Sequence, residues 1–254
     1  MKPFFNKTKS PPLTRKEAIK KRLLTFSVIL NVVFVILVAF IIDRKGGVEY
    51  IKSKLETESV KGLSNYDTDY YYSKKSIFEV MPNDSNEIIF LGNSITNYCD
   101  WNEFFGNPKI KNRGINGDMI NGIIERIDEV VESKPEKIFL MIGINDLGRY
   151  RTRNQILNDY ERLISLIIEK TPTTTLYIQS ILPTDGIHAN NDAIIMINGR
   201  LEQLCEKYEL TYINVFDAFK TSKNKLNPKY TLEGIHLNGE GYLVWKKELD
   251  KYMN

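Results

Sequence analysis

The sequence predicts an α/β fold in which a five-stranded parallel sheet carries helices on both sides. From residue 87 onward, short continuous apolar runs alternate with longer amphipathic ones. The short runs are typical of strands buried on both faces, and the longer ones of helices that cover them. The stretches between the short runs can hold crossover helices, so the strands are expected to lie parallel. Ahead of this body, the sequence predicts one transmembrane helix.

The first 22 residues form a basic tail. They hold eight Lys or Arg and one Glu, a net charge of +7, whereas the whole chain carries +3. The rest of the chain therefore carries −4. Nucleic-acid binding depends on clustered Lys and Arg, so this acidic body argues against a nucleic-acid partner.

Residues 23–42 form an uncharged, predominantly apolar stretch of 20 residues. A helix of that length spans about 30 Å, the thickness of the hydrocarbon core of a membrane. The alternative is a cleaved signal peptide, which needs a shorter apolar region and a small-x-small cleavage site; residues 38–40 (Val-Ala-Phe) fit such a site poorly. We therefore expect an uncleaved signal anchor. Lys and Arg lie mainly before the span, which predicts a cytoplasmic N-terminus and a periplasmic or cell-surface body.

A connector of residues 43–82 is expected to join this anchor to a domain of residues 83–254. In the connector, residues 70–72 (Tyr-Tyr-Tyr) could form a platform for sugar stacking. We favour the alternative that they pack a short helix, ending before Pro82, onto the domain. The domain itself is large enough to bury a core without disulfides.

Cysteine and histidine are scarce. Cys99 and Cys205 could pair in an oxidising compartment, but they have no framework spacing, and we interpret both as small apolar residues. His188 and His236 are the only histidines in the sequence. Because zinc sites need clusters of Cys, His and acidic residues, we expect no metal site and no cofactor.

The five strands are expected at residues 88–91, 110–112, 137–142, 175–181 and 211–215. Helical stretches are expected near residues 119–133, 154–170, 193–208 and 241–252. Open parallel sheets bind ligands beyond the carboxyl ends of their strands. The loops that follow the strands are therefore where functional residues are expected.

Four of these loops carry groups suited to acyl-transfer chemistry. Ser94 follows the first strand in Gly-Asn-Ser-Ile-Thr, and Gly117 follows the second in Arg-Gly-Ile-Asn-Gly-Asp. Asn145 follows the third strand in Gly-Ile-Asn-Asp. The loop before the last helix reads Thr-Leu-Glu-Gly-Ile-His and contains Glu233 and His236. A serine hydroxyl needs an adjacent base to act as a nucleophile, and the base needs a carboxylate that holds its tautomer.

Together and in this order, the four loops resemble the signature blocks of the SGNH (GDSL-type) hydrolase family over residues 87–252. The resemblance implies a flavodoxin-like three-layer α/β/α sandwich and an acylhydrolase activity. It also implies roles for the site residues. Ser94 is the nucleophile, His236 the base and Glu233 the orienting carboxylate, while the N–H groups of Ser94 and Gly117 and the side chain of Asn145 form the oxyanion hole.

Two residues depart from the family pattern. Asn93 stands where the family has Asp, and Glu233 replaces the Asp three residues before the base. A second Asp-x-x-His, formed by Asp185 and His188, follows the fourth strand and is an alternative source of the base. We favour His236, because the residues after it lead into a final helix as in the family.

If His236 is the base, His188 is either a substrate contact or an exposed loop residue. Asn93 and Asp146 are further candidates for substrate contacts. Both follow predicted strands, so each is expected near the edge of the sheet where ligands bind.

We expect a membrane-anchored serine esterase that hydrolyses small acyl esters outside the cytoplasm. The resemblance to sugar acetylesterases implies acetyl groups on carbohydrate. No Gly-x-Ser-x-Gly elbow is present, which argues against an α/β-hydrolase. Two alternatives stay open: an O-acetyltransferase would pass the acyl group to an envelope glycan, and a noncatalytic glycan-binding or scaffold protein would carry a decayed site marked by Asn93 and Glu233.

Overall fold

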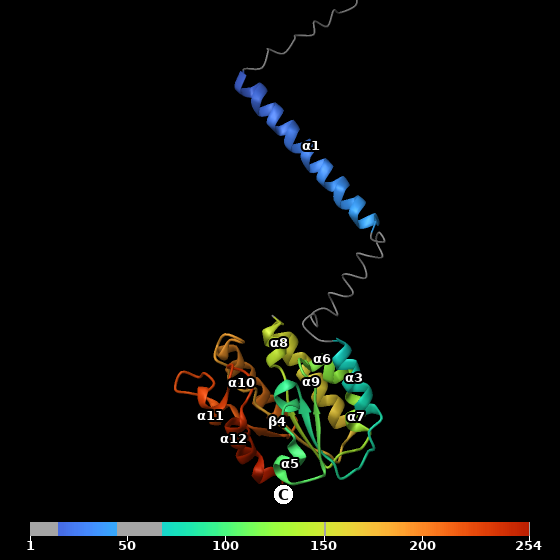
Figure 1. Ribbon diagram of the computed structural model, residues 1–254, viewed down its shortest axis with the longest axis vertical. Helices are drawn as coiled ribbons and strands as arrows, with labels where there is room; N and C mark the ends of the chain where they lie inside the picture. The colour runs from blue at the N-terminus through green and yellow to red at the C-terminus, as the bar shows by residue number, and fades with distance from the viewer. Residues whose placement is uncertain (1–14, 45–67, 150, 254) are drawn as a thin grey trace, which may run out of the picture. The chain divides into compact units, whose positions relative to one another are not determined.

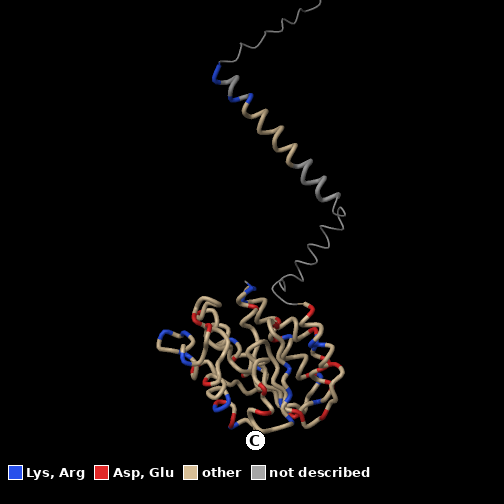
Figure 2. The backbone as a smooth tube through the Cα atoms, in the orientation of Figure 1, with Lys and Arg blue, Asp and Glu red and all other residues tan. Residues whose placement is uncertain are grey.

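The computed structural model describes residues 15–44, 68–149 and 151–253. The chain divides into two units, Met1–Gly62 and Leu63–Asn254. The first unit contains helix α1 (Arg15–Arg44), in which the Lys and Arg residues coloured in Figure 2 lie in the first turns. Within the described residues, no helix has the length and apolarity that a membrane crossing needs. The anchor at residues 23–42 thus stays a prediction from the sequence.

The second unit is built on a five-stranded parallel sheet with the order β2-β1-β3-β4-β5 (Figure 1). The strands are β1 (Ile88–Gly92), β2 (Ile110–Gly114), β3 (Lys137–Met141), β4 (Thr175–Gln179) and β5 (Thr211–Ile213). The predicted sheet is confirmed: every strand begins at the expected residue, and the ends differ by one or two. All residues of β1 and β3 are buried, as expected for strands covered on both faces.

Helices lie on both sides of the sheet (Figure 1). On one side, α9 (Arg153–Lys170) contacts α6 (Ile120–Glu125), α7 (Ile127–Val131) and α10 (Asn191–Lys207). On the other side lie α5 (Trp101–Phe105) and α12 (Gly239–Leu249), joined by the edge-to-face contact of Trp101 and Trp245 at 4.8 Å. The remaining helices are α3 (Thr68–Glu79), α4 (Ser94–Asn97), α8 (Ile144–Gly148) and α11 (Phe216–Phe219), with 3-10 turns at Pro228–Tyr230 and Asp250–Tyr252.

Helix α3 packs on the sheet-containing unit, as favoured for the tyrosine-rich end of the connector. Tyr71 is buried and its hydroxyl donates a hydrogen bond to the Gly122 carbonyl at 2.7 Å. Phe78, near the other end of the helix, is also buried. Tyr71 and Phe78 therefore pack α3 onto the domain.

The stretch expected to be one helix over residues 119–133 is two. Arg126 ends α6 and precedes α7 with φ −111° and ψ 15°, outside the helical region. Its guanidinium is fully buried, so the chain bends to bring a charged residue inward. Sequence periodicity cannot indicate this break, because a charged residue in an amphipathic stretch is normally expected on the solvent side.

The two cysteines are free and buried. Burial raises the pKa of both Cys99 and Cys205 to about 12, with a smaller contribution from a neighbouring acid in each case. They act as small core residues, and the alternative of a disulfide between them is not realised.

Candidate active site

Ser94 lies at the turn from β1 into α4. Gly92 ends the strand, and its backbone passes so close to Thr96 that any side chain at position 92 would clash. Asn93 caps the helix, because its Oδ1 accepts the Ile95 N–H at 3.0 Å. Ser94 is thus the first helical residue, and its own N–H has no partner within the helix.

Ser94, His236 and Glu233 form a hydrogen-bonded chain. Ser94 Oγ lies 2.8 Å from His236 Nε2, and His236 Nδ1 lies 2.6 Å from Glu233 Oε1. A carboxylate only accepts hydrogen bonds, so it holds the proton on Nδ1 and leaves Nε2 to take the serine proton. The Ser94 residue is buried, whereas the side chains of His236 and Glu233 are 30% and 46% exposed. This arrangement can produce a serine nucleophile beside an imidazole that water can reach.

The loop that carries Glu233 and His236 turns back on itself. Thr231 Oγ1 donates to the His236 carbonyl at 2.6 Å and accepts the Gly234 N–H at 2.9 Å. Gly234 has φ +94°, in the left-handed region that favours glycine. The turn lets a glutamate three residues before the histidine reach its ring, despite the extra methylene.

The three predicted oxyanion donors follow three neighbouring strands. Ser94 follows β1, Gly117 follows β2 and Asn145 follows β3, and these strands are adjacent in the sheet. Gly117 has φ +76°, a conformation that glycine adopts without strain. Asn145 Nδ2 donates to the Asp118 carbonyl at 2.8 Å, which ties the second loop to the third. Two amide protons on one nitrogen leave a second one for a ligand.

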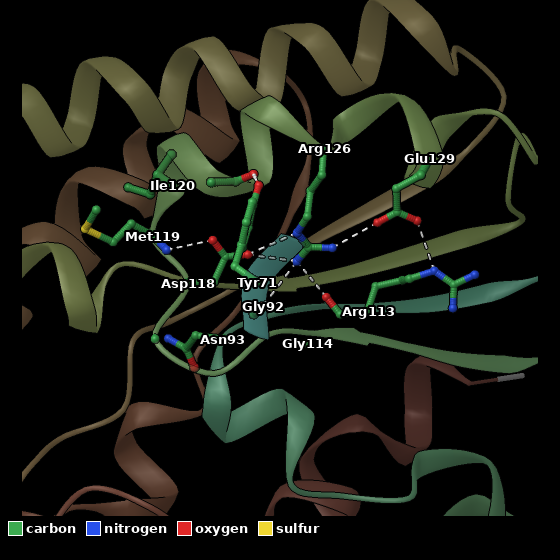
Figure 3. Close-up of polar contacts among 12 residues, drawn as sticks. Tyr71, Gly92, Asn93, Arg113, Gly114, Asp118, Met119, Ile120, Arg126 and Glu129 are labelled. Atoms are coloured by element: carbon green, nitrogen blue, oxygen red, sulfur yellow. Dashed lines mark hydrogen bonds and ion pairs between the residues drawn. The ribbon is translucent and has the colours of Figure 1, made fainter. Parts of the chain in front are cut away.

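A buried charged cluster supports the loop after β2 (Figure 3). Arg126 donates to Asp118 Oδ2 from Nε and Nη2, at 3.0 and 2.9 Å, and to Glu129 Oε1 at 2.9 Å. Arg113 reaches the other oxygen of Glu129 at 3.1 Å. Burial lowers the pKa of Arg126, but Asp118 and Glu129 more than offset this and keep the guanidinium charged. None of these four residues was among the site residues predicted from the sequence.

The same arginine contacts the strand ends beside the nucleophile. Its Nη2 donates to the Arg113 carbonyl at 2.8 Å and lies 3.5 Å from the Gly92 carbonyl. Asp118, its partner, is next to Gly117 and supplies the carbonyl that binds Asn145. Arg126 therefore links the end of β1 to the loop that presents the oxyanion donors.

Two of the candidate substrate contacts have protein partners instead. Asn93 is buried and caps α4. Asp146 is fully buried. It accepts hydrogen bonds from the Ile120 N–H at 3.3 Å and from Arg151 Nη1 at 3.0 Å. Burial raises the pKa of Asp146 to about 6, although Arg151 lowers it. Both side chains therefore make structural contacts within the domain, and their role in substrate binding stays a prediction.

The second Asp-x-x-His does not contact the serine but lies beside the first. Asp185 Oδ1 is 3.1 Å from His188 Nδ1, so this acid orients His188 and not His236. The other ring nitrogen of His188, Nε2, lies 3.8 Å from Glu233 Oε2. His188 also borders a surface cavity of about 640 Å³, lined in addition by Asn190, Lys223 and Lys225.

An aromatic side chain beside the base was not expected from the sequence. The ring of Tyr98 lies 4.9 Å from that of His236, and Tyr98 is 52% exposed. It lies just after the short helix that begins with Ser94, and an exposed tyrosine in a turn carries no pattern that indicates a site. Among the described residues, no group of three or more His, Cys, Asp or Glu side chains is placed to hold a metal ion.

The model of the GDSL-like Lipase/Acylhydrolase family matches residues 90–244. A Streptococcus pneumonia protein, provisionally described as a platelet activating factor, has a similar structure: the two chains are 28% identical with a TM-score of 0.69, covering 78% of this chain and 99% of the other. An acetylxylan esterase from Geobacillus stearothermophilus has the same fold at 15% identity and a TM-score of 0.56, covering 67% of this chain and 94% of the other.

One curated relative is the N-acylneuraminate cytidylyltransferase of Escherichia coli O18:K1:H7 (strain RS218 / NMEC). It is 26% identical over 170 residues, which are 65% of this chain. The match spans only 39% of the relative's length.

Proposed function

The chain belongs to the GDSL-like lipase/acylhydrolase family, and from this premise we propose that it is a serine esterase that cleaves small acyl esters. The observation that carries the proposal is the hydrogen-bonded chain from Ser94 through His236 to Glu233, with distances of 2.8 and 2.6 Å. A decayed or purely binding site would have no need of this alignment.

In the proposed reaction, His236 Nε2 takes the hydroxyl proton of Ser94 while Oγ attacks the ester carbonyl carbon. The carbonyl oxygen becomes an oxyanion, which accepts hydrogen bonds from the N–H groups of Ser94 and Gly117 and from Asn145 Nδ2. The imidazolium, stabilised by Glu233, then gives its proton to the leaving alcohol as the C–O bond breaks. An acyl-enzyme remains on Ser94.

Water completes the proposed cycle. His236 takes a proton from a water molecule that attacks the acyl carbon, and returns it to Ser94 Oγ as the acid leaves. The exposure of His236 and Glu233 favours hydrolysis, since water can approach the base directly. An O-acetyltransferase would need an acceptor hydroxyl to replace that water, so transfer is an outcome for the experiment below to detect.

We further propose that the acyl group is acetyl and that the alcohol is a carbohydrate. The acetylxylan esterase among the structures with this fold supports the proposal, as does the acidic sugar in the name of the curated relative. A cavity of about 640 Å³ borders His188, within the range of typical ligand pockets. It offers space for a sugar unit close to Glu233.

The membrane attachment is proposed from the sequence alone. Residues 23–42 would anchor the protein with its N-terminus in the cytoplasm and the esterase in the periplasm or at the cell surface. Membrane fractionation of the full chain and of a chain that lacks residues 1–42 would test this. Release of the full chain from the membranes into the soluble fraction by washes at high salt and high pH would contradict the attachment.

The decisive experiment compares the full chain with its Ser94→Ala variant on an aryl acetate and on acetylated oligosaccharides. We expect the variant to lose at least about 10³-fold in kcat. Ser76→Ala is a matched control, because Ser76 is exposed on α3 and only bonds the Ser73 carbonyl. Equal rates for wild type and Ser94→Ala would refute the serine mechanism. Adding free sugar acceptors tests transfer: acetylated sugar exceeding released acetate would favour the transferase.

A further inference from the structure

The outer carboxylate of the Ser94-His236-Glu233 chain lies between two histidines. Glu233 Oε1 binds His236, while Glu233 Oε2 lies 3.8 Å from His188 Nε2. This second distance is too long for a direct hydrogen bond but is that of an ion pair when the imidazole is protonated. On its far side, His188 Nδ1 lies 3.1 Å from Asp185 Oδ1. Five side chains thus form one continuous line from Ser94 to Asp185.

Asp185, on the loop after β4, is held against the loop that carries Glu233 and His236. Its N–H donates to the Gly234 carbonyl at 2.9 Å, and any side chain at Gly234 would clash with the Asp185 carboxylate. Its Oδ1 also accepts the N–H of Ile187 at 2.8 Å. Although burial raises the pKa of Asp185, the hydrogen bonds from Ile187 and His188 lower it below the ordinary value. Asp185 is therefore a charged, well-positioned partner for His188.

The hydrogen-bonding chemistry determines which form of His188 suits this place. Both of its ring nitrogens face carboxylates, and carboxylates only accept hydrogen bonds. A neutral imidazole can donate to Asp185 but presents no charge to Glu233. The imidazolium donates to Asp185 and also places a positive charge 3.8 Å from Glu233.

We propose that His188, held by Asp185, is a positioning residue that tunes the base His236 through Glu233. This inference rests on the proposed function. As an imidazolium, His188 partly neutralises Glu233 and thereby weakens the stabilisation that Glu233 gives to a protonated His236. Loss of the imidazolium would leave Glu233 unshared, and Glu233 would then stabilise the protonated form of His236 more strongly.

Charged side chains other than Asp185 and Glu233 also lie around His188. Lys223, Lys225 and Asp192 line the cavity that His188 borders, and Asp185 and Glu233 face its ring from two loops. Among the described residues, Asp185 and Glu233 are the carboxylates that lie within 4 Å of a His188 ring nitrogen. They are therefore the groups through which a change at His188 acts.

The test is the pH dependence of kcat/KM on a small aryl acetate. We expect His188→Ala to move the acid limb to higher pH by roughly 0.2–0.7 units, the size of a half-exposed ion pair. Rates below the midpoint would fall about two- to fivefold and converge with wild type in the alkaline range. His188→Lys, which restores a cation beside Glu233, should return the limb toward its original position, and Asp185→Asn should move it in the same direction as His188→Ala.

The matched control is Lys229→Gln, which removes a cation 3.7 Å from Glu240, an exposed pair of nearly the same length that does not touch Glu233. It should leave the acid limb in place. An unchanged limb in His188→Ala, or an equal shift in His188→Ala and His188→Lys, would overturn the inference. Loss of activity at every pH in His188→Ala would overturn it too, by making His188 the base. Failure of the proposed function is separate, since it would leave wild type without Ser94-dependent hydrolysis.

Discussion

Glu233 Oε1 accepts two hydrogen bonds from His236, one from ring Nδ1 at 2.6 Å and one from the backbone N–H at 2.7 Å. The backbone bond fixes the oxygen independently of the ring. The glutamate carboxylate is thereby held in place although its side chain is 46% exposed. The longer side chain, which departs from the family pattern, is accommodated by this local turn.

Replacement of Glu233 by Gln should cost less than the equivalent change in a typical serine triad. The His236 N–H will keep an acceptor oxygen at the Oε1 position, so the tautomer of the ring is retained and only the charge is lost. We expect kcat to fall by about 10²-fold, against roughly 10⁴ where an amide imposes the wrong tautomer. Glu233→Ala, which removes the acceptor, should lose more. Equal losses in the two variants, measured on an aryl acetate, would contradict this role of the backbone bond.

Removal of the Asn145 side chain tests the oxyanion hole. Asn145→Ala should lower kcat by about 10²–10³-fold with little change in KM, because the donor acts mainly on charge that develops in the transition state. Asn158→Ala is the control, since Asn158 is exposed on α9. Thermal unfolding of both variants would separate catalysis from stability. A change confined to KM would assign Asn145 to substrate binding.

The buried cluster around Arg126 should dominate a stability measurement. Arg126→Met would leave Asp118 buried without its guanidinium partner, and we expect the free energy of unfolding to fall by roughly 3–5 kcal/mol. Lys246→Met removes a partly exposed cation 2.9 Å from Asp250 and should cost under about 1 kcal/mol. Denaturant titration of both variants checks this. Similar losses of stability in the two variants would contradict the expected penalty for leaving the buried Asp118 carboxylate without a partner.

Asp146 predicts a pH dependence of stability. Burial raises its pKa in the folded protein to about 6 from 3.8, so the folded state holds its proton more tightly than the unfolded state. This contribution to stability is fully present below pH 3.8 and is lost as the pH rises through 6. Between pH 4 and pH 6.5, the free energy of unfolding of Asp146→Asn should therefore rise by on the order of 2–3 kcal/mol relative to that of wild type. A difference between the two proteins that does not vary over this range, in denaturant titrations, would contradict the shift.

The sequence was most informative where one residue pattern has one structural solution. Short apolar runs such as residues 137–142, which alternate with longer amphipathic stretches, predict buried strands, and each strand begins where expected. The positions of Ser94, Glu233 and His236 could be expected to meet because parallel strands end at one edge of a sheet. The topology places Ser94 at this edge, whereas the choice of His236 over His188 rested on the resemblance to the family.

Polar partners were harder to predict, because periodicity reports burial but not what a buried polar group contacts. Asn93 was expected to shape the turn by hydrogen bonding, and it caps α4. Asp146 suggested a ligand contact by its place after a strand, and the structure shows it buried against Arg151. Arg126 and Glu129 were not among the predicted site residues, and both are buried and paired with each other. The contact of His188 with Glu233 joins two loops whose separation in the sequence conceals it.

Helix α3 has a consequence for where the chain can be cut. Phe78 stacks over the guanidinium of Arg113, with 4.8 Å between the ring centroid and Cζ, and Tyr71 bonds the Gly122 carbonyl. A fragment that starts at residue 83 would strip this cover from the charged cluster and admit water to it. We therefore expect a fragment that starts at residue 83 to have a lower free energy of unfolding than one that includes α3, although both contain every residue of the triad.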